Sequence, residues 1–239
     1  MKDKNFTDVQ SRLSIPNSQF YIRIIRWAFA RFYREFAWTY DIVAAAVSGG
    51  RWIAWGQAAL PYLRGQVLEL GCGTGNLQRA LARELGGQLV AGLDASPQML
   101  AIARRKLAGS GQSHRLVRAV AQALPFPATS FDSIVATFPS EYIIDSATLA
   151  ELRRVVRPRG RIVVALAASF GADGLYYRLL DLLYRLTLQR SPGEPPASTP
   201  ESSLGQALAE IGFVVEERWQ PVGRNQVHLV IGKATADIG

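Results

Sequence analysis

Val67-Leu68-Glu69-Leu70-Gly71-Cys72-Gly73-Thr74-Gly75-Asn76-Leu77 is the segment with the strongest structural signal in this chain. Its first four residues are apolar except for one acid, which is typical of a short buried strand. Three glycines follow at alternate positions, and the leucine spacing after them predicts a helix. Glycine adopts positive φ and lets a ligand approach without meeting a Cβ atom, and the start of a helix offers unpaired N–H groups. A strand, a glycine turn and a helix in this order can therefore hold a nucleotide-like ligand.

The glycine spacing distinguishes between cofactors. A dinucleotide site requires Gly-x-Gly-x-x-Gly, whereas the third glycine here, Gly75, comes one residue earlier. Glu69 lies two residues before the first glycine, and a second acid, Asp94, closes the next apolar segment, 89–93. An acid at the end of a second strand can accept hydrogen bonds from both ribose hydroxyls of a nucleoside. The alternative interpretation is a tight turn between strand and helix whose two acids are only solvated.

The pattern Glu69-x-Gly71-x-Gly73-x-Gly75, joined to Asp94, resembles the cofactor-binding motif of the class I S-adenosylmethionine (SAM) dependent methyltransferases. Within that class it is similar to the methyltransferase-11 group and to the quinone-biosynthesis C-methyltransferases. The resemblance implies an α/β, Rossmann-like fold: a seven-stranded, mostly parallel sheet in the order 3-2-1-4-5-7-6 with helices on both faces. It also implies SAM as the cofactor, S-adenosylhomocysteine as its product, and no metal. The residues that it assigns to cofactor binding are Glu69, Gly71, Cys72, Gly73, Thr74, Gly75, Asp94, Ala95, Met99, Ala121, Gln122, Thr137 and Phe138.

The adenine segment departs from the family pattern at one position. Residues 121–127 resemble the family's segment that lines the adenine, but Val120 stands where the family has an acid. We expect adenine to be read instead by the backbone around Ala121 and by the side chain of Gln122.

Hydrophobic periodicity and turn residues predict the other elements of the fold. They are helices at 51–60, 96–108, 149–156 and 204–211, strands at 89–94, 116–120, 130–137 and 162–166, and a closing strand pair at 213–219 and 226–231.

Two segments extend beyond the nucleotide fold. We expect residues 1–60 to form an N-terminal helical extension or cap, and residues 61–239 to form the SAM-binding domain, with a helical insertion at about 171–200. Residues 20–38 predict an amphipathic helix with arginines on one face, which can lie at a lipid surface or pack as a cap with its arginines in water. Tyr40 and the following residues resemble the region before the glycine motif in quinone-biosynthesis C-methyltransferases.

Composition limits the classes of site and partner. The chain has 239 residues, and 49% of them are hydrophobic, enough for a full core. A single cysteine excludes a disulfide framework and a multi-cysteine metal site. The net charge of +8 favours contact with phosphates of nucleic acid or anionic lipid without identifying the partner. No signal-type apolar core follows the N-terminus, so we expect a cytoplasmic protein, with peripheral membrane contact through 20–38 left open.

The chemistry of methyl transfer requires few protein groups. The enzyme must align a nucleophile with the S–CH₃ bond, and a general base helps when the nucleophile loses a proton. The candidates for proton transfer are Tyr40, Glu141 and Tyr142. For each of them a purely structural role is the competing interpretation.

Absent motifs narrow the choice of acceptor. The segment 137–140, Thr-Phe-Pro-Ser, lacks the Asn/Asp-Pro-Pro-Tyr/Phe pattern of enzymes that methylate amino groups of bases. Cys72 lies inside the glycine turn, where it cannot serve as an attacking thiol. We therefore expect a small apolar or amphipathic acceptor such as a quinone precursor, a lipid or a secondary metabolite, and nucleic acid is disfavoured. The alternatives are a non-catalytic SAM-binding module that docks a partner, and an RNA methyltransferase.

Overall fold

A computed structural model describes residues 50–85, 90–108, 114–169 and 202–236, together with Ala45 and Ser48. These residues all belong to one compact unit, 41–239. The helix predicted at 20–38, the candidate Tyr40 and the insertion predicted at 171–200 lie outside the described residues. The predicted division at residue 60 therefore stays a prediction.

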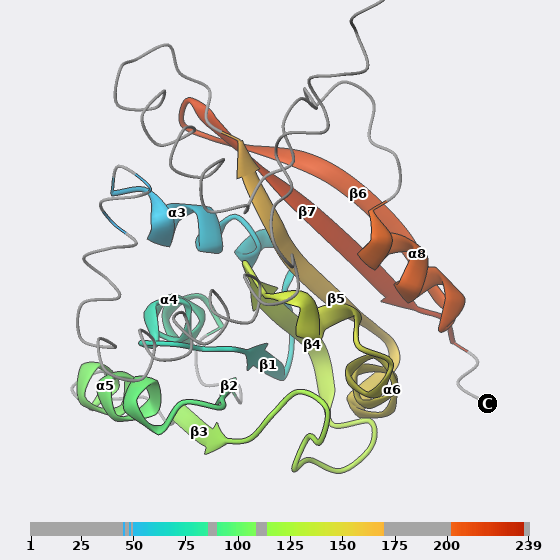
Figure 1. Cartoon of the computed structure of the whole chain (residues 1–239), viewed down its shortest axis with the longest axis horizontal. Coiled ribbons are helices and arrows are strands. Elements are labelled where there is room, and N and C mark those ends of the chain that lie inside the picture. The colour runs from blue at the N-terminus through green and yellow to red at the C-terminus, as the bar shows by residue number, and fades with distance from the viewer. Residues whose placement is uncertain are drawn as a thin grey trace, which may run out of the picture. The chain divides into compact units, whose positions relative to one another are not determined.

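The centre of the unit is a seven-stranded sheet in the order β3-β2-β1-β4-β5-β7-β6 (Figure 1), which confirms the predicted order. Neighbouring strands from β3 to β5 run parallel, and β7 pairs antiparallel with both β5 and β6. The strands are β1 (Val67–Leu70), β2 (Val90–Asp94), β3 (His114–Arg118), β4 (Phe131–Thr137), β5 (Val156–Ser169), β6 (Phe213–Val222) and β7 (Asn225–Ala234).

Polar caps fix where several helices begin. The described helices are α3 (Trp52–Gln57), α4 (Asn76–Glu84), α5 (Pro97–Leu107), α6 (Ser146–Val155) and α8 (Ser203–Glu210), with 3-10 turns η2 (Leu60–Tyr62) and η3 (Glu141–Ile144). The side chains of Ser96, Asp145 and Ser202 each accept a hydrogen bond from a backbone N–H in the first turn of α5, α6 and α8, respectively. Such caps satisfy N–H groups that have no partner within the helix.

Element boundaries differ from the prediction where polar residues extend an element. Helix α6 begins three residues earlier than predicted, because Asp145 caps it with its Oδ1 on the N–H of Ala147 at 2.9 Å. Strand β3 begins at His114 and ends at Arg118, two residues earlier than predicted, because its pairing with β2 starts opposite Val90. Apolar periodicity detects the buried part of an element, whereas these ends are set by backbone pairing and capping.

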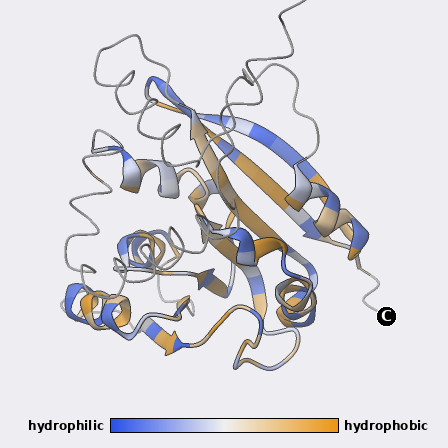
Figure 2. Ribbon diagram, in the orientation of Figure 1, coloured by the Kyte–Doolittle hydropathy of each residue, from blue (hydrophilic) through white to orange (hydrophobic). Residues whose placement is uncertain are grey.

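Alternate residues of the central strands face two separate cores. Leu68, Ile134 and Ile162 pack in the core that includes α6 and α8, whereas their neighbours Val67, Val135 and Val163 pack in the core that includes α3 and α4. This alternation is the period-two pattern of a strand buried on both faces. Figure 2 shows the central strands in hydrophobic colours and the edge strand β6 as largely hydrophilic. Helices on both faces thus leave the carboxyl ends of β1, β2 and β4 along one rim of the sheet.

Candidate cofactor site

The three glycines of the turn between β1 and α4 share a backbone conformation but differ in their surroundings. All three adopt the left-handed backbone, with φ of 66°, 51° and 82° at Gly71, Gly73 and Gly75. A Cβ atom at Gly75 would lie 3.2 Å from the Cβ of Ala103 on α5, and one at Gly71 would lie 3.2 Å from the hydroxyl of Tyr142. A Cβ at Gly73 would meet nothing within 4 Å. Gly75 therefore permits α4 and α5 to pack closely, while Gly73 borders open space into which a ligand fits.

Asp94 connects this turn to the end of β2. Its Oδ2 accepts a hydrogen bond from the N–H of Gly73 at 2.9 Å, and its Oδ1 accepts one from the N–H of Ser96 at 2.8 Å. Burial raises the pKa of Asp94, and the two backbone hydrogen bonds oppose that shift. A carboxylate offers about four acceptor positions. Asp94 therefore organises the turn and keeps lone pairs for further donors, such as two ribose hydroxyls.

Glu69 lies under the turn, on the face of the sheet that α4 covers. Its side chain is 2% exposed and accepts a hydrogen bond from Nε2 of Gln78 on α4 at 2.7 Å. Burial raises the pKa of Glu69 from 4.5 to about 8, although the Gln78 hydrogen bond lowers it. The carboxyl group is therefore mostly protonated at neutral pH. Glu69 joins β1 to α4 beneath the site.

The side chain of Gln78, which is hydrogen-bonded to Glu69, fits only because the neighbouring strand has a glycine beside it. Gly92 is the residue of β2 that pairs with Glu69, and a Cβ there would lie 2.9 Å from Cδ of Gln78 and 2.9 Å from Cδ2 of Leu116. Gln78 was missed by the sequence reasoning. The signal was a glycine inside an otherwise apolar strand, which often marks a close approach by another group.

An aromatic cluster lies where β4 ends. The ring of Phe138 is 4.5 Å from that of Trp52 and 6.3 Å from that of Trp55, measured between centroids, and both tryptophans come from α3. Phe138 has φ of 50°, an uncommon value for a residue with a side chain, and its N–H donates to the carbonyl of Ala165 at 2.7 Å. Backbone strain of this kind concentrates at functional sites. Phe138 and Trp52 are both half-buried and pack against the core that includes α3 and α4. Because Leu70 of β1 pairs with Ala136 of β4, Phe138 follows β4 on the strand next to the glycine turn, and we call these two rings the aromatic wall.

Tyr142 and Glu141 lie on η3, the 3-10 turn that follows β4 in the chain. The hydroxyl of Tyr142 faces Gly71. Burial raises the pKa of Tyr142 well above its usual range, and the nearby carboxylates of Asp94 and Glu69 add to the effect. The hydroxyl therefore stays protonated and acts as a hydrogen-bond donor. Glu141, the neighbouring residue, is exposed.

The other predicted cofactor residues fall around the same rim with different exposure. Thr74 and Met99 are buried, Ala95 is exposed, Ala121 is buried, and Gln122 and Thr137 are half-buried. Cys72 is 4% exposed, and burial raises the pKa of its thiol far above the usual range, with Glu69 and Asp94 adding to the shift. The thiol therefore stays protonated. Val120 is 47% exposed at the position where the family has an acid.

Two side chains of α6 that the sequence analysis did not identify, Glu151 and Arg154, hold the adenine segment in place. Glu151 on α6 accepts a hydrogen bond from the N–H of Leu124, and Arg154 donates to the carbonyls of Leu124 and Phe126 at 3.0 and 2.8 Å. The two side chains also pair with each other at 2.7 Å. This bracket fixes the segment that carries Ala121. The i,i+3 spacing of Glu and Arg on a helix indicates a pair, but it does not reveal which loop the pair holds.

Within the described part of the chain, no group of three or more His, Cys, Asp or Glu side chains could hold a metal ion. Over the same residues, no helix is both long enough and apolar enough to cross a membrane.

Comparison with known proteins places this geometry in a family. Residues 67–160 match the model of a methyltransferase domain. The chain is 38% identical over 154 residues to a demethylmenaquinone methyltransferase of Thermus thermophilus, which covers 62% of this chain and 70% of the relative. It is 30% identical over 224 residues to a demethylmenaquinone methyltransferase of Geobacillus kaustophilus, covering 83% of this chain and 94% of the relative. Other curated relatives, named as ubiquinone/menaquinone biosynthesis C-methyltransferases, are matched over little more than half of their length, 55% and 53% in two cases.

A likeness to solved structures supports the same fold. A SAM-dependent methyltransferase from Aquifex aeolicus superimposes with a TM-score of 0.53 at 21% identity, covering 75% of this chain and 89% of that one. At this identity the likeness establishes the fold alone.

Proposed function

Because this chain belongs to the class I SAM-dependent methyltransferases, we propose that it transfers the methyl group of SAM to a ring carbon of a quinone precursor. The observation that carries the proposal is the combination of the cofactor turn, with Asp94 bonded to the N–H of Gly73 at 2.9 Å, and an aromatic wall beside it. The names of the matched relatives, both demethylmenaquinone methyltransferases, support the choice of acceptor.

The residues of the turn suit SAM. The cofactor supplies an activated methyl group on a sulfonium, so the protein's task is to hold and align the reactants. Asp94 would hold the ribose with its remaining lone pairs, and the backbone at Gly73 would lie against the ligand without a Cβ in the way. The bracket of Glu151 and Arg154 would keep the adenine segment in position.

The acceptor side combines an apolar wall with one fixed donor. Aromatic rings stack favourably against other aromatic rings, so Phe138 and Trp52 suit a flat quinol ring. The hydroxyl of Tyr142, protonated throughout the working pH range, would donate to an oxygen of the acceptor and so orient the ring. Methylation forms a bond from the ring carbon to the methyl group, breaks the S–CH₃ bond and releases the ring proton. We assign Glu141 to receive that proton, because it is the exposed carboxylate next to Tyr142.

The test supplies methyl-labelled SAM with demethylmenaquinol, kept reduced so that the ring is electron-rich. We expect label in the organic phase with the quinol, much less with the oxidised quinone, and almost none with the variant D94A. Tight SAM binding without transfer to the quinol would favour a docking module, and label in RNA would favour the nucleic-acid alternative. Either result would overturn the proposed acceptor.

A further inference from the structure

Helices α4 and α5 present a strongly basic surface. Together they carry five cations, Arg79, Arg83, Arg104, Arg105 and Lys106, and one acid, Glu84. The two helices are neighbours, since Gly75 at the start of α4 packs on Ala103 of α5 and Nζ of Lys106 donates to Oδ1 of Asn76 at 2.8 Å. We call these five cations the basic face. Four of these cations are exposed, whereas Lys106 is half-buried, and a local excess of positive charge attracts anions.

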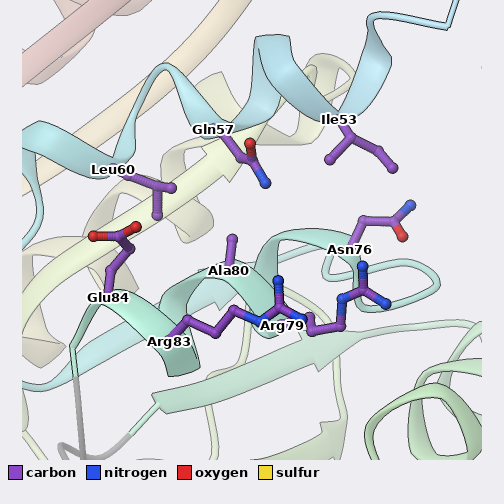
Figure 3. A pocket seen from close by; sticks show the side chains of 8 residues that line it. All are labelled: Ile53, Gln57, Leu60, Asn76, Arg79, Ala80, Arg83 and Glu84. Atoms are coloured by element: carbon purple, nitrogen blue, oxygen red, sulfur yellow. The ribbon is translucent and has the colours of Figure 1, made fainter. Parts of the chain in front are cut away.

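A hollow adjoins the basic face between α3 and α4 (Figure 3). Its apolar lining comes from Ile53, Leu60 and Ala80. Its polar lining comes from Gln57, Asn76, Arg79, Arg83 and Glu84. Ile53 is 46% exposed, so its side chain is accessible from solvent. The hollow therefore combines apolar side chains with two cations and one acid, which leaves an excess of positive charge.

The two arginines of the hollow are available to a ligand. They are four residues apart, so they lie one above the other on the same side of α4. Both side chains are exposed, and neither guanidinium group forms a hydrogen bond or ion pair with another residue that the structure describes. Guanidinium groups bind phosphate oxygens in bidentate fashion. Two exposed guanidinium groups on the same side of α4 thus offer donors that suit phosphate oxygens.

We propose that the basic face and this hollow dock on a bilayer that contains anionic phospholipid, with Ile53 entering the interface and Arg79 and Arg83 binding headgroup phosphates. Exposed aliphatic groups flanked by cations are typical of interfacial membrane contact. Single-stranded nucleic acid instead calls for aromatic platforms beside the cations, and the hollow has none among its lining residues. Charge and apolar exposure together favour lipid over RNA.

The test is vesicle flotation with the full-length chain, compared between phosphatidylcholine vesicles and vesicles that also contain phosphatidylglycerol. An arginine near an anionic surface contributes about five-fold to partitioning, so R79Q/R83Q should lower binding to the anionic vesicles by roughly 25-fold. The matched control is R159Q/R224Q, which removes the same charge from two exposed arginines outside the basic face. I53N should weaken the binding to vesicles that persists at high salt, because that part depends on apolar contact and not on charge.

The outcomes separate the alternatives. Equal partitioning of R79Q/R83Q and wild type, or an equal loss in R159Q/R224Q, would overturn the proposal. So would a loss of RNA-oligonucleotide binding in R79Q/R83Q while vesicle binding is unchanged. Calorimetry with SAM should give the same affinity for all variants, which confirms that they fold. Because flotation needs neither acceptor nor turnover, its failure is distinct from a failure of the proposed methyl transfer.

Discussion

The buried carboxyl of Glu69 makes a quantitative prediction about stability. Replacing it in E69Q keeps the shape and the acceptor for Nε2 of Gln78 at 2.7 Å, but removes the titrating group. In the SAM-free protein, the folded state holds the proton of Glu69 up to a pKa of about 8, whereas the unfolded chain releases it near 4.5.

The sign and size of the change in the free energy of unfolding with pH follow from proton linkage. Between pH 4.5 and 8 the folded state binds one proton more than the unfolded state, so the free energy of unfolding falls as pH rises. The slope is about 1.4 kcal/mol per pH unit. The stabilisation is complete below pH 4.5 and is lost as pH rises to about 8, a total of roughly 5 kcal/mol. E69Q does not lose this stabilisation as pH rises. The free energy of unfolding of E69Q minus that of wild type should therefore be roughly 3 kcal/mol larger at pH 7 than at acidic pH.

Urea unfolding at a series of pH values between 5 and 8 measures the difference directly. E84Q is the control, because it removes an exposed carboxylate from α4, the helix that also carries Gln78. We expect the wild-type and E84Q profiles to run together and the E69Q profile to diverge upward with pH. Parallel profiles for wild type and E69Q would mean that Glu69 ionises as it does in water, and the account of a buried acid under the turn would be wrong.

Three further changes test other parts of the site. G92A should lower the free energy of unfolding by about 1–3 kcal/mol in urea titrations, because its Cβ would lie 2.9 Å from Gln78; unchanged stability would contradict the close contact. V120D should tighten SAM binding about five-fold in calorimetry, since a carboxylate returns to the adenine edge at a cost in solvation that is small for a side chain 47% exposed; weaker binding would place the adenine elsewhere. Y142F should lower kcat/KM for the quinol about ten-fold without changing the shape of the pH–rate profile, because the hydroxyl acts as a donor and does not titrate; a lost alkaline or acidic limb would show that it transfers a proton.

The sequence was most informative where backbone conformation and residue type are tightly linked. Left-handed φ values at Gly71, Gly73 and Gly75 favour glycine, so their spacing predicted the turn. The acid that closes β2 was predicted as a ribose ligand, and its hydrogen bond to the N–H of Gly73 was not predicted. The strand order followed from the family resemblance that these residues established. Local rules were sufficient because the turn is made of consecutive residues, and Asp94 is recognised by its place at the end of the next strand, 21 residues after Gly73.

Long-range polar contacts could not be predicted in the same way. The partner of Glu69 is Gln78 on α4, and the bracket of Glu151 and Arg154 holds a loop that precedes it by about 27 residues in the chain. Side chains of these types are ordinary on helix surfaces, and only the packing of helix on sheet decides which of them become buried. The contact between Phe138 and Trp52 is missed for the same reason, because it joins the end of β4 to a helix 86 residues earlier.

The most direct test of the cofactor site is isothermal titration calorimetry of wild type and D94A with SAM and with S-adenosylhomocysteine. Asp94 offers charge-assisted hydrogen bonds to two ribose hydroxyls, so its loss should weaken binding by about 3 kcal/mol or more, roughly 100-fold. Saturable heat in wild type and at least this loss in D94A are the predicted results. No heat with either ligand, or equal affinity in D94A, would contradict a SAM site built from the glycine turn and the acid that ends β2.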